Sequence, residues 1–185
     1  MNAIECLRRM AQNNAWASLR FHRAVGQLDD QEYRAERTSF FPSLHLTLVH
    51  ILFVDIYYVD ALEGVTGDVA ALWAECQRFE REEGFASVHA AQREVDLRLV
   101  RFTDALQSDS DLDRPVNIQR RDHVQVERCG DVLMHLFEHQ IHHRGQAHAM
   151  LAGTRIAPPQ LDEFFLADEL PKRRAELEEL GLPLR

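Results

Sequence analysis

The sequence lacks the features that mark secreted and membrane-spanning proteins. Its three cysteines, Cys6, Cys76 and Cys129, lie far apart and form neither a disulfide framework nor a CxxC motif. No apolar run reaches about 18 residues, so we expect no membrane-spanning helix. The first residues also lack the apolar core of a signal peptide. We therefore expect a cytoplasmic protein.

Positive charge is also scarce. The chain has 21 Lys and Arg residues against 30 Asp and Glu residues, which gives a formal net charge of −9. This balance opposes binding to nucleic acid or to an anionic membrane. The length of 185 residues fits a single domain over 1–185 that can bury its own core.

Apolar residues recur with helical spacing along the chain, and no segment shows a convincing strand alternation. We predict long helices over 4–25, 44–62, 86–106 and 122–152, and a shorter one over 68–82. A last helical stretch over 161–180 is expected to break or kink at Pro171. Residues 108–115 are predicted to form a loop, and 116–119 a short extended piece. The predicted fold class is all-α, a four-helix bundle with additional short helices.

The second predicted helix, over 44–62, is apolar nearly all round. Such a helix belongs in the middle of a bundle or at a contact between subunits. We therefore expect a homodimer.

Five of the ten histidines lie within fourteen residues of the fourth predicted helix: His135, His139, His142, His143 and His148. At about 100° per residue, His143 and His139 lie about 40° and 80° from the centre of the apolar face, and the other three about 100° to 140° from it. His139 and His143 thus project one turn apart, which suits binding of a single metal ion. The alternative is that both are core histidines bonded to backbone or carboxylate.

A metal site needs at least a third ligand, which must come from another helix. The second helix offers His45 and His50. His50 is favoured because an unpartnered imidazole in mid-helix is costly to bury, whereas water or a cap can satisfy His45 near the helix start. His22, His89 and His123 look like surface or flanking residues. Three imidazoles suit zinc, nickel, iron, manganese or cobalt and do not choose among them.

Three blocks of the sequence resemble the DinB-like family, which is sometimes grouped with YfiT-like metal-dependent hydrolases. They are Ser39-Phe-Phe-Pro-Ser-Leu-His-Leu-Thr-Leu-Val-His50-Ile-Leu-Phe-Val-Asp55, His139-Gln-Ile-His-His143-Arg-Gly-Gln146 and Pro158-Pro-Gln-Leu-Asp-Glu-Phe-Phe165. The resemblance implies a four-helix bundle with a three-histidine metal site, which falls on His50, His139 and His143. The family usually has Asn where this chain has Val49. The resemblance also implies a low-molecular-weight thiol as partner, because characterised members include thiol-dependent transferases and isomerases, although many members have no established reaction.

Two functional hypotheses follow, with a third as the plainest alternative. The first is an enzyme of thiol S-transferase or hydrolase type, in which one divalent metal, zinc or nickel before the others, activates a thiol or water. The second is a non-catalytic metal-binding bundle for stress response or interaction. The third is a helical dimerisation module with incidental histidines.

Three further residues are candidates for supporting the metal site: Asp55, Arg144 and Gln146. Arg144 either binds a substrate carboxylate or forms an outward salt bridge. Asp55 either belongs to the site or lies on the helix surface, and Tyr57 and Tyr58 either line the pocket or pack. His135 and His142 are expected to be bystanders.

Overall fold

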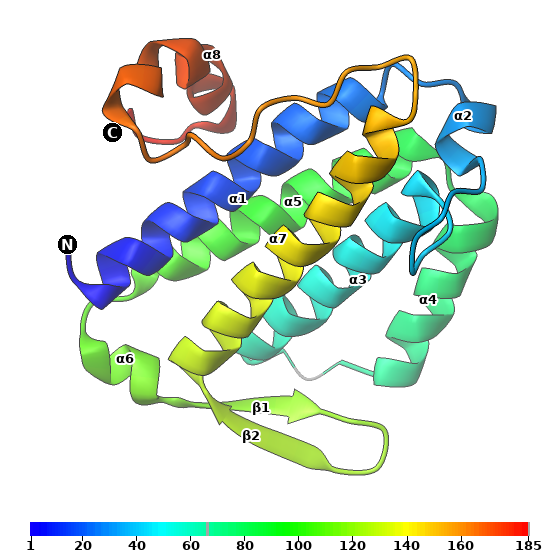
Figure 1. Ribbon diagram of the computed structural model, residues 1–185. Helices are drawn as coiled ribbons and strands as arrows, with labels where there is room; N and C mark the ends of the chain where they lie inside the picture. Colours follow the sequence, from blue (N-terminus) through cyan, green and yellow to red (C-terminus); the bar gives the residue numbers. More distant parts are fainter. Residues whose placement is uncertain (66, 185) are drawn as a thin grey trace.

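The computed structural model describes residues 1–65 and 67–184. Its four longest helices lie side by side, as Figure 1 shows: α1 (Ala3–Val25), α3 (Leu44–Glu63), α5 (Phe85–Ala105) and α7 (Cys129–Ala152). Helix α3 packs against α5 and α7, and α1 packs against the same two helices from the other side of the core. The predicted all-helical fold class is confirmed, with one small hairpin as the exception.

Local sequence sets where the helices begin and end. The Asn2 side chain accepts a hydrogen bond from the backbone N–H of Glu5, and the Ser43 hydroxyl accepts one from Leu46. Each satisfies an N–H group that would otherwise lack a partner at a helix start. Helix α3 ends at Gly64, whose φ of 76° is left-handed and therefore favours a residue without Cβ.

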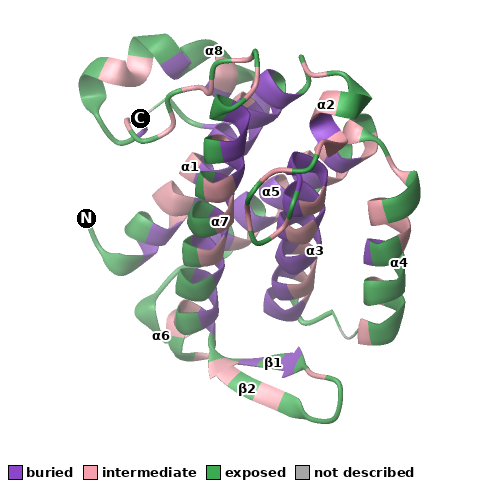
Figure 2. Cartoon of the chain, turned by 45° about the vertical axis from the view of Figure 1, so that its right-hand side comes forward, coloured by how far each residue is buried: buried purple, intermediate pink, exposed green. Residues whose placement is uncertain are grey.

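Helix α3 is the central helix of the bundle. By length and composition it could cross a membrane, but 72% of its most apolar stretch of 18 residues is buried inside the bundle. Figure 2 shows α3 as mostly buried. Helices α4 (Val69–Glu82), α5 and α7 all contact it. Its apolar surface is therefore used within the chain, and the homodimer expectation no longer rests on this helix.

A β-hairpin replaces the first part of the predicted fourth helix. Strand β1 (Pro115–Gln119) pairs antiparallel with β2 (Val124–Arg128), and α7 begins only at Cys129. The predicted helix start at 122 is therefore wrong. The extended piece predicted over 116–119 is confirmed as β1, in which Val116 and Ile118 alternate with exposed residues and are buried. Strand β2 is the part predicted to be helical.

Three other elements differ from the prediction. A short helix α6 (Asp109–Asp113) lies in the predicted loop, started by a capping box between Ser108 and Asp111. A short α2 (Asp30–Arg34) precedes α3. Helix α8 covers only Leu170–Leu180, after a 3-10 turn at Ala167–Glu169. Pro171 lies in its first turn, where a missing N–H costs nothing, so it starts this helix and does not kink it.

Candidate metal centre

Three histidines from two helices meet between α3 and α7. His50 projects from α3, and His139 and His143 project from α7. The ring centroid of His143 lies 4.5 Å from that of His50 and 4.5 Å from that of His139, and the other two centroids are 5.0 Å apart. One nitrogen from each ring can be chosen so that all three lie within 4.8 Å of one another. We call these residues the histidine cluster.

The environment keeps the cluster uncharged at neutral pH. Burial, with a smaller contribution from His143, lowers the pKa of His50 to about 4. Burial, followed by the neighbouring histidines, lowers the pKa of His139 to about 3. Burial also lowers the pKa of His143. Neutral imidazoles offer free nitrogen lone pairs, which is the form that binds metal.

The nitrogen spacing fits a shared ion. Nε2 of His50 and Nε2 of His139 are 3.0 Å apart, so two lone pairs face each other unless a proton or a cation lies between them. Two ligand nitrogens of a tetrahedral zinc ion, each about 2.0–2.1 Å from it, would be about 3.3 Å apart. A small adjustment of the rings therefore accommodates a metal.

Gln146 orients one ligand of the cluster. Nδ1 of His143 lies 2.8 Å from Oε1 of Gln146, so the ring donates its Nδ1–H and leaves Nε2 free to bind a metal. Nε2 of Gln146 in turn donates to His142, 3.1 Å away. Nδ1 of His139, by contrast, is buried without a hydrogen-bond partner among the described residues.

A loop before α3 covers one side of the cluster. The Phe41 ring stacks on His50 with centroids 4.2 Å apart at 28°, and lies 5.6 Å from His143. The loop is closed by a hydrogen bond from the Arg37 backbone N–H to the Pro42 carbonyl, 2.8 Å long. Phe40 beside it is 80% exposed. Sequence reasoning assigned Phe41 no role, because nothing in the spacing of this segment links it to a histidine.

The remaining histidines of α3 and α7 lie outside the cluster. His45 is buried on the α4 side, with Nε2 3.0 Å from the Glu80 carbonyl. His135 is exposed and meets Tyr58 edge-on, with centroids 4.9 Å apart. His142 is exposed, and His148 bonds the Pro159 carbonyl on another face of α7.

Asp55 and Arg144 do not surround the cluster but belong to a second polar group inside the bundle. Nη1 of Arg144 donates to Oδ1 of Asn14 at 2.6 Å, and Nδ2 of Asn14 donates to Asp96 at 2.7 Å. Nε2 of Gln92 is 2.7 Å from Asp55 and 3.0 Å from Asp96. We call these five residues, one or two from each long helix, the buried polar layer.

This layer corrects two expectations. Arg144 is only 7% exposed, so it forms no outward salt bridge, and Asp55 is 1% exposed, so it does not lie on the helix surface. Burial and then the charge of Asp96 raise the pKa of Asp55 well above its usual range. Burial also raises the pKa of Asp96 to about 7. A signal for the layer was present, because Gln92 and Asp96 fall on the apolar stripe of Val88, Leu99 and Thr103.

His22 also differs from the expectation of a surface residue. It is buried, and its Nδ1 lies 3.2 Å from Nδ1 of His89. Burial and then the neighbouring His89 lower the pKa of His22 to about 3. One ring must donate to the other, so this pair is a core hydrogen bond between α1 and α5.

The histidine cluster offers three ligand atoms and is only partly covered by the protein. All three cluster residues are half-buried, so part of each imidazole is within reach of solvent. The group includes no carboxylate, which distinguishes it from mixed histidine and carboxylate sites.

Comparison with known proteins agrees with this arrangement. The model of the DinB family matches residues 1–174. Over 168 residues the chain is 28% identical to Protein DinB of Bacillus subtilis (strain 168), and the match covers 89% of this chain and 96% of that protein. Because the family match extends over nearly all of the bundle and includes every residue of the histidine cluster, the chain belongs to the DinB family.

Proposed function

We propose that the protein is an enzyme that holds one divalent metal ion through His50, His139 and His143 and activates a thiol or water there. The observation that carries this proposal is the convergence of three neutral imidazoles at a half-buried place between α3 and α7. When bound, the metal supplies positive charge that lowers the pKa of a coordinated water or thiol. The reaction would be a thiol S-transfer or a hydrolysis.

The residues around the cluster favour thiol activation over hydrolysis. The group includes no carboxylate to serve as a general base for water. A low-molecular-weight thiol needs only to lose its proton to become a nucleophile. Gln146 keeps His143 in the tautomer that leaves Nε2 free, and Phe41 excludes water from one side.

The metal is proposed to be zinc or nickel, with iron, manganese and cobalt also compatible. Three imidazoles are ligands of intermediate softness and accept each of these ions. Metal availability and the open coordination position would then decide between them.

Elemental analysis of untagged protein tests the metal proposal. We expect about one divalent ion per chain, because the cluster supplies the three ligands of a typical catalytic site. A content well below one, after purification without chelators, would refute the proposal.

A reactivity screen tests the enzymatic part. Metal-loaded protein is incubated with glutathione and other cellular thiols and a panel of aryl halide, epoxide and ester electrophiles. The matched control is His139→Ala, which lacks one ligand and whose fold is verified by circular dichroism. Turnover by the wild type that vanishes in the control supports the enzyme. Metal binding without turnover supports the second candidate below.

One observation favours that second candidate, a non-catalytic metal-binding bundle for stress response or interaction. Phe41 stacks on His50 and covers part of the cluster, which suits an ion that braces α3 against α7. Spectroscopy of the cobalt-loaded protein separates the candidates. A spectrum that responds to added thiol indicates an open position, whereas an unresponsive spectrum indicates a brace.

We also propose that two copies associate as a homodimer, because Met134 and Ile141, seven residues apart on α7, are large apolar side chains that are 64% and 50% exposed. Size-exclusion chromatography with light scattering would show twice the chain mass of 21.4 kDa. A mass equal to one chain at micromolar concentration would refute this.

A further inference from the structure

Arg120, in the turn of the β-hairpin, is a half-buried cation without a carboxylate partner. Its Nε donates to Oε1 of Gln125 at 2.8 Å, and its Nη1 donates to the Tyr57 hydroxyl at 3.2 Å. Throughout residues 1–65 and 67–184, no carboxylate forms an ion pair with it. A further hydrogen bond joins Arg120 to the side chain of Tyr58. These bonds fix the guanidinium but use only part of its five N–H groups. A fixed guanidinium with donors to spare is suited to a planar carboxylate.

Arg120 lines a cavity of about 290 Å³ at the hairpin end of α3 and α7. Tyr58 and His135 form the side of this cavity that faces the histidine cluster, with ring centroids 4.9 Å apart. The His135 ring is in turn 6.4 Å from that of His139. We call this cavity the Arg120 pocket. It therefore lies about one helical turn along α7 from the histidine cluster.

Helix geometry gives the span between the two places. Tyr58 follows His50 by eight residues on α3, and His135 precedes His143 by eight residues on α7. At 1.5 Å per residue this separation is about 12 Å, and it is about 6 Å from His135 to His139. A ligand that occupies both places would have its anionic group roughly 10 Å from its metal-binding atom.

The charges around the pocket restrict the anion. Glu127 and Asp131 also line it. Asp131 is paired with Arg128 at 2.9 Å, whereas Glu127 accepts a hydrogen bond only from the neutral Gln125 among its described neighbours. One free negative charge beside Arg120 disfavours a phosphate dianion. The pocket therefore suits a monocarboxylate.

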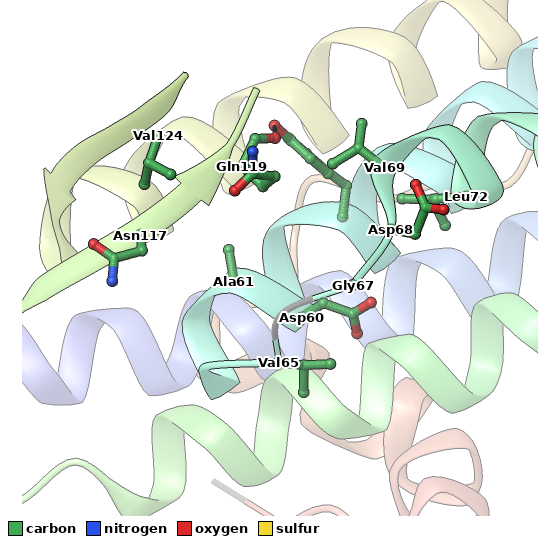
Figure 3. Close-up of a pocket in the computed structure, with 11 residues that line it drawn as sticks. Asp60, Ala61, Val65, Gly67, Asp68, Val69, Leu72, Asn117, Gln119 and Val124 are labelled. Atoms are coloured by element: carbon green, nitrogen blue, oxygen red, sulfur yellow. Dashed lines mark hydrogen bonds between the residues drawn. The ribbon is translucent and has the colours of Figure 1, made fainter. Parts of the chain in front are cut away.

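Two neighbouring cavities fit this anion less well. The cavity in Figure 3, about 170 Å³, lies between the hairpin, the end of α3 and the start of α4, and its charged residues Asp60 and Asp68 are both acidic. A larger cavity of about 630 Å³ on the far side of Tyr57 is lined by both Arg120 and Arg121. His135 does not line this larger cavity, so a ligand bound there would not extend toward the histidine cluster.

We propose that the Arg120 pocket binds the carboxylate of a substrate whose reacting group lies at the histidine cluster, roughly 10 Å away. This inference rests on the proposed function. It names a specificity residue, Arg120, and a substrate class, monocarboxylates long enough to reach from one place to the other.

Cobalt-loaded protein and a series of ω-mercaptocarboxylates test the proposal. The series runs from mercaptoacetate to mercaptoundecanoate, each compared with the ω-mercaptoalcohol of the same length. Thiolate binding to cobalt gives a charge-transfer absorption, which reports Kd. We expect the acid to bind at least about tenfold more tightly than the alcohol near mercaptooctanoate, where the chain spans roughly 10 Å.

Two variants of equal charge change provide the comparison. Arg120→Gln should bring the acid-to-alcohol ratio of Kd close to one, while binding of the alcohol and cobalt content stay unchanged. Arg121→Gln should keep the wild-type ratio, because Arg121 is exposed and does not line the Arg120 pocket. Circular dichroism verifies the fold of both variants.

The contrary outcomes are separable. No preference for the acid in the wild type, or a preference that survives Arg120→Gln, would overturn the carboxylate pocket. An equal loss in Arg121→Gln would place the anion in the larger cavity and overturn the assignment to this one. A cobalt protein that binds no thiol, not even mercaptoethanol, would refute thiol activation at the cluster and this inference with it, and would leave only the hydrolytic form of the proposed function.

Discussion

The histidine cluster and the buried polar layer make an instructive pair, because neighbouring residues of α7 supply both. His143 joins the cluster and Arg144 the layer, since consecutive side chains leave a helix about 100° apart. The cluster is half-buried, and two of its ring nitrogens face each other without a hydrogen-bond donor fixed between them. The layer is closed from solvent, and its members bond to one another across all four long helices.

The comparison distinguishes polar groups whose atoms are available to a ligand from polar groups whose hydrogen bonds stabilise the fold. Buried charges are tolerated only when they are paired or neutralised, and the layer achieves this with one guanidinium and two carboxyls of raised pKa. The cluster is neutral by contrast, so its lone pairs can remain available at little cost. Variants in each group should therefore affect different quantities.

The largest effect on stability is expected from Arg144→Met. Removal of the guanidinium leaves Oδ1 of Asn14 buried without its donor and takes away the positive charge near Asp96 and Asp55, which should lower the free energy of unfolding by about 3 kcal/mol. Urea denaturation of the metal-free protein measures this. Metal content of the folded variant should stay near that of the wild type.

The matched control is Arg101→Ala. Arg101 pairs with Glu94 on the surface, where both side chains are more than 60% exposed, so its loss should cost no more than about 1 kcal/mol. Equal costs for the two variants would mean that the layer contributes no more than a surface pair.

Replacing a cluster residue should affect metal binding instead of folding. His50→Ala, His139→Ala and His143→Ala are each expected to weaken metal affinity by more than about 100-fold, because two imidazoles cannot complete the site. Competition with a chromogenic chelator measures the affinity. His135→Ala and His142→Ala should retain most of it, since both residues are exposed and outside the cluster.

Gln146→Ala should also change metal affinity and not folding, with a smaller effect than loss of a ligand. Loss of the acceptor that fixes the His143 tautomer should reduce metal affinity by about 10- to 100-fold. Unfolding of the metal-free protein should be nearly unchanged. An affinity equal to that of the wild type would show that the ring of His143 is oriented by packing alone.

The pH dependence of stability is expected to distinguish Asp55→Asn from the wild type. Because the folded-state pKa of Asp55 is raised, the native protein binds its proton more strongly, and this stabilisation disappears as the pH rises toward that pKa. The variant should therefore gain stability relative to the wild type from pH ~5 to ~8, by up to about 1.4 kcal/mol per pH unit.

Taking the difference between the two proteins cancels the contribution of histidines with lowered pKa, which has the opposite sign. Metal-free protein is used at every pH. A difference that does not change with pH would show that Asp55 is ionised in the folded state throughout this range.

The sequence was sufficient for the bundle and for the choice of histidines on α7. Apolar spacing gave the four long helices, and the angular position of His139 and His143 separated them from their exposed neighbours. The preference for His50 over His45 rested on the cost of burying an imidazole, because α3 is apolar on every side and its periodicity has no preferred direction. The structure reverses that premise, since His45 is the more buried of the two and is bonded to the Glu80 carbonyl. Only the packing of α4 against His45 shows which way each ring points.

Other features depend on contacts that a local pattern does not contain. Strand β1 matches the short extended piece predicted over 116–119, but the sequence predicts that β2 belongs to the following helix, because no residue of β2 is fully buried and its alternation is weak. Arg144 sits one residue from a cluster histidine, and only the positions of Asn14 and Asp96 on other helices explain why it turns inward. Phe41 reaches His50 through a loop whose course no periodicity describes.

The loop that carries Phe41 has a consequence for the speed of metal exchange. Because the ring lies flat on His50 and near His143, an incoming chelator cannot approach from that side until the loop moves. Loop opening, and not only affinity, would then set how long an ion stays. Phe41→Ala should accelerate stripping by excess chelator, while Phe40→Ala, which removes an exposed ring that packs edge-on against Phe41 at 4.9 Å, should accelerate it less. An ion bound at the cluster would then leave slowly even when the concentration of free metal falls.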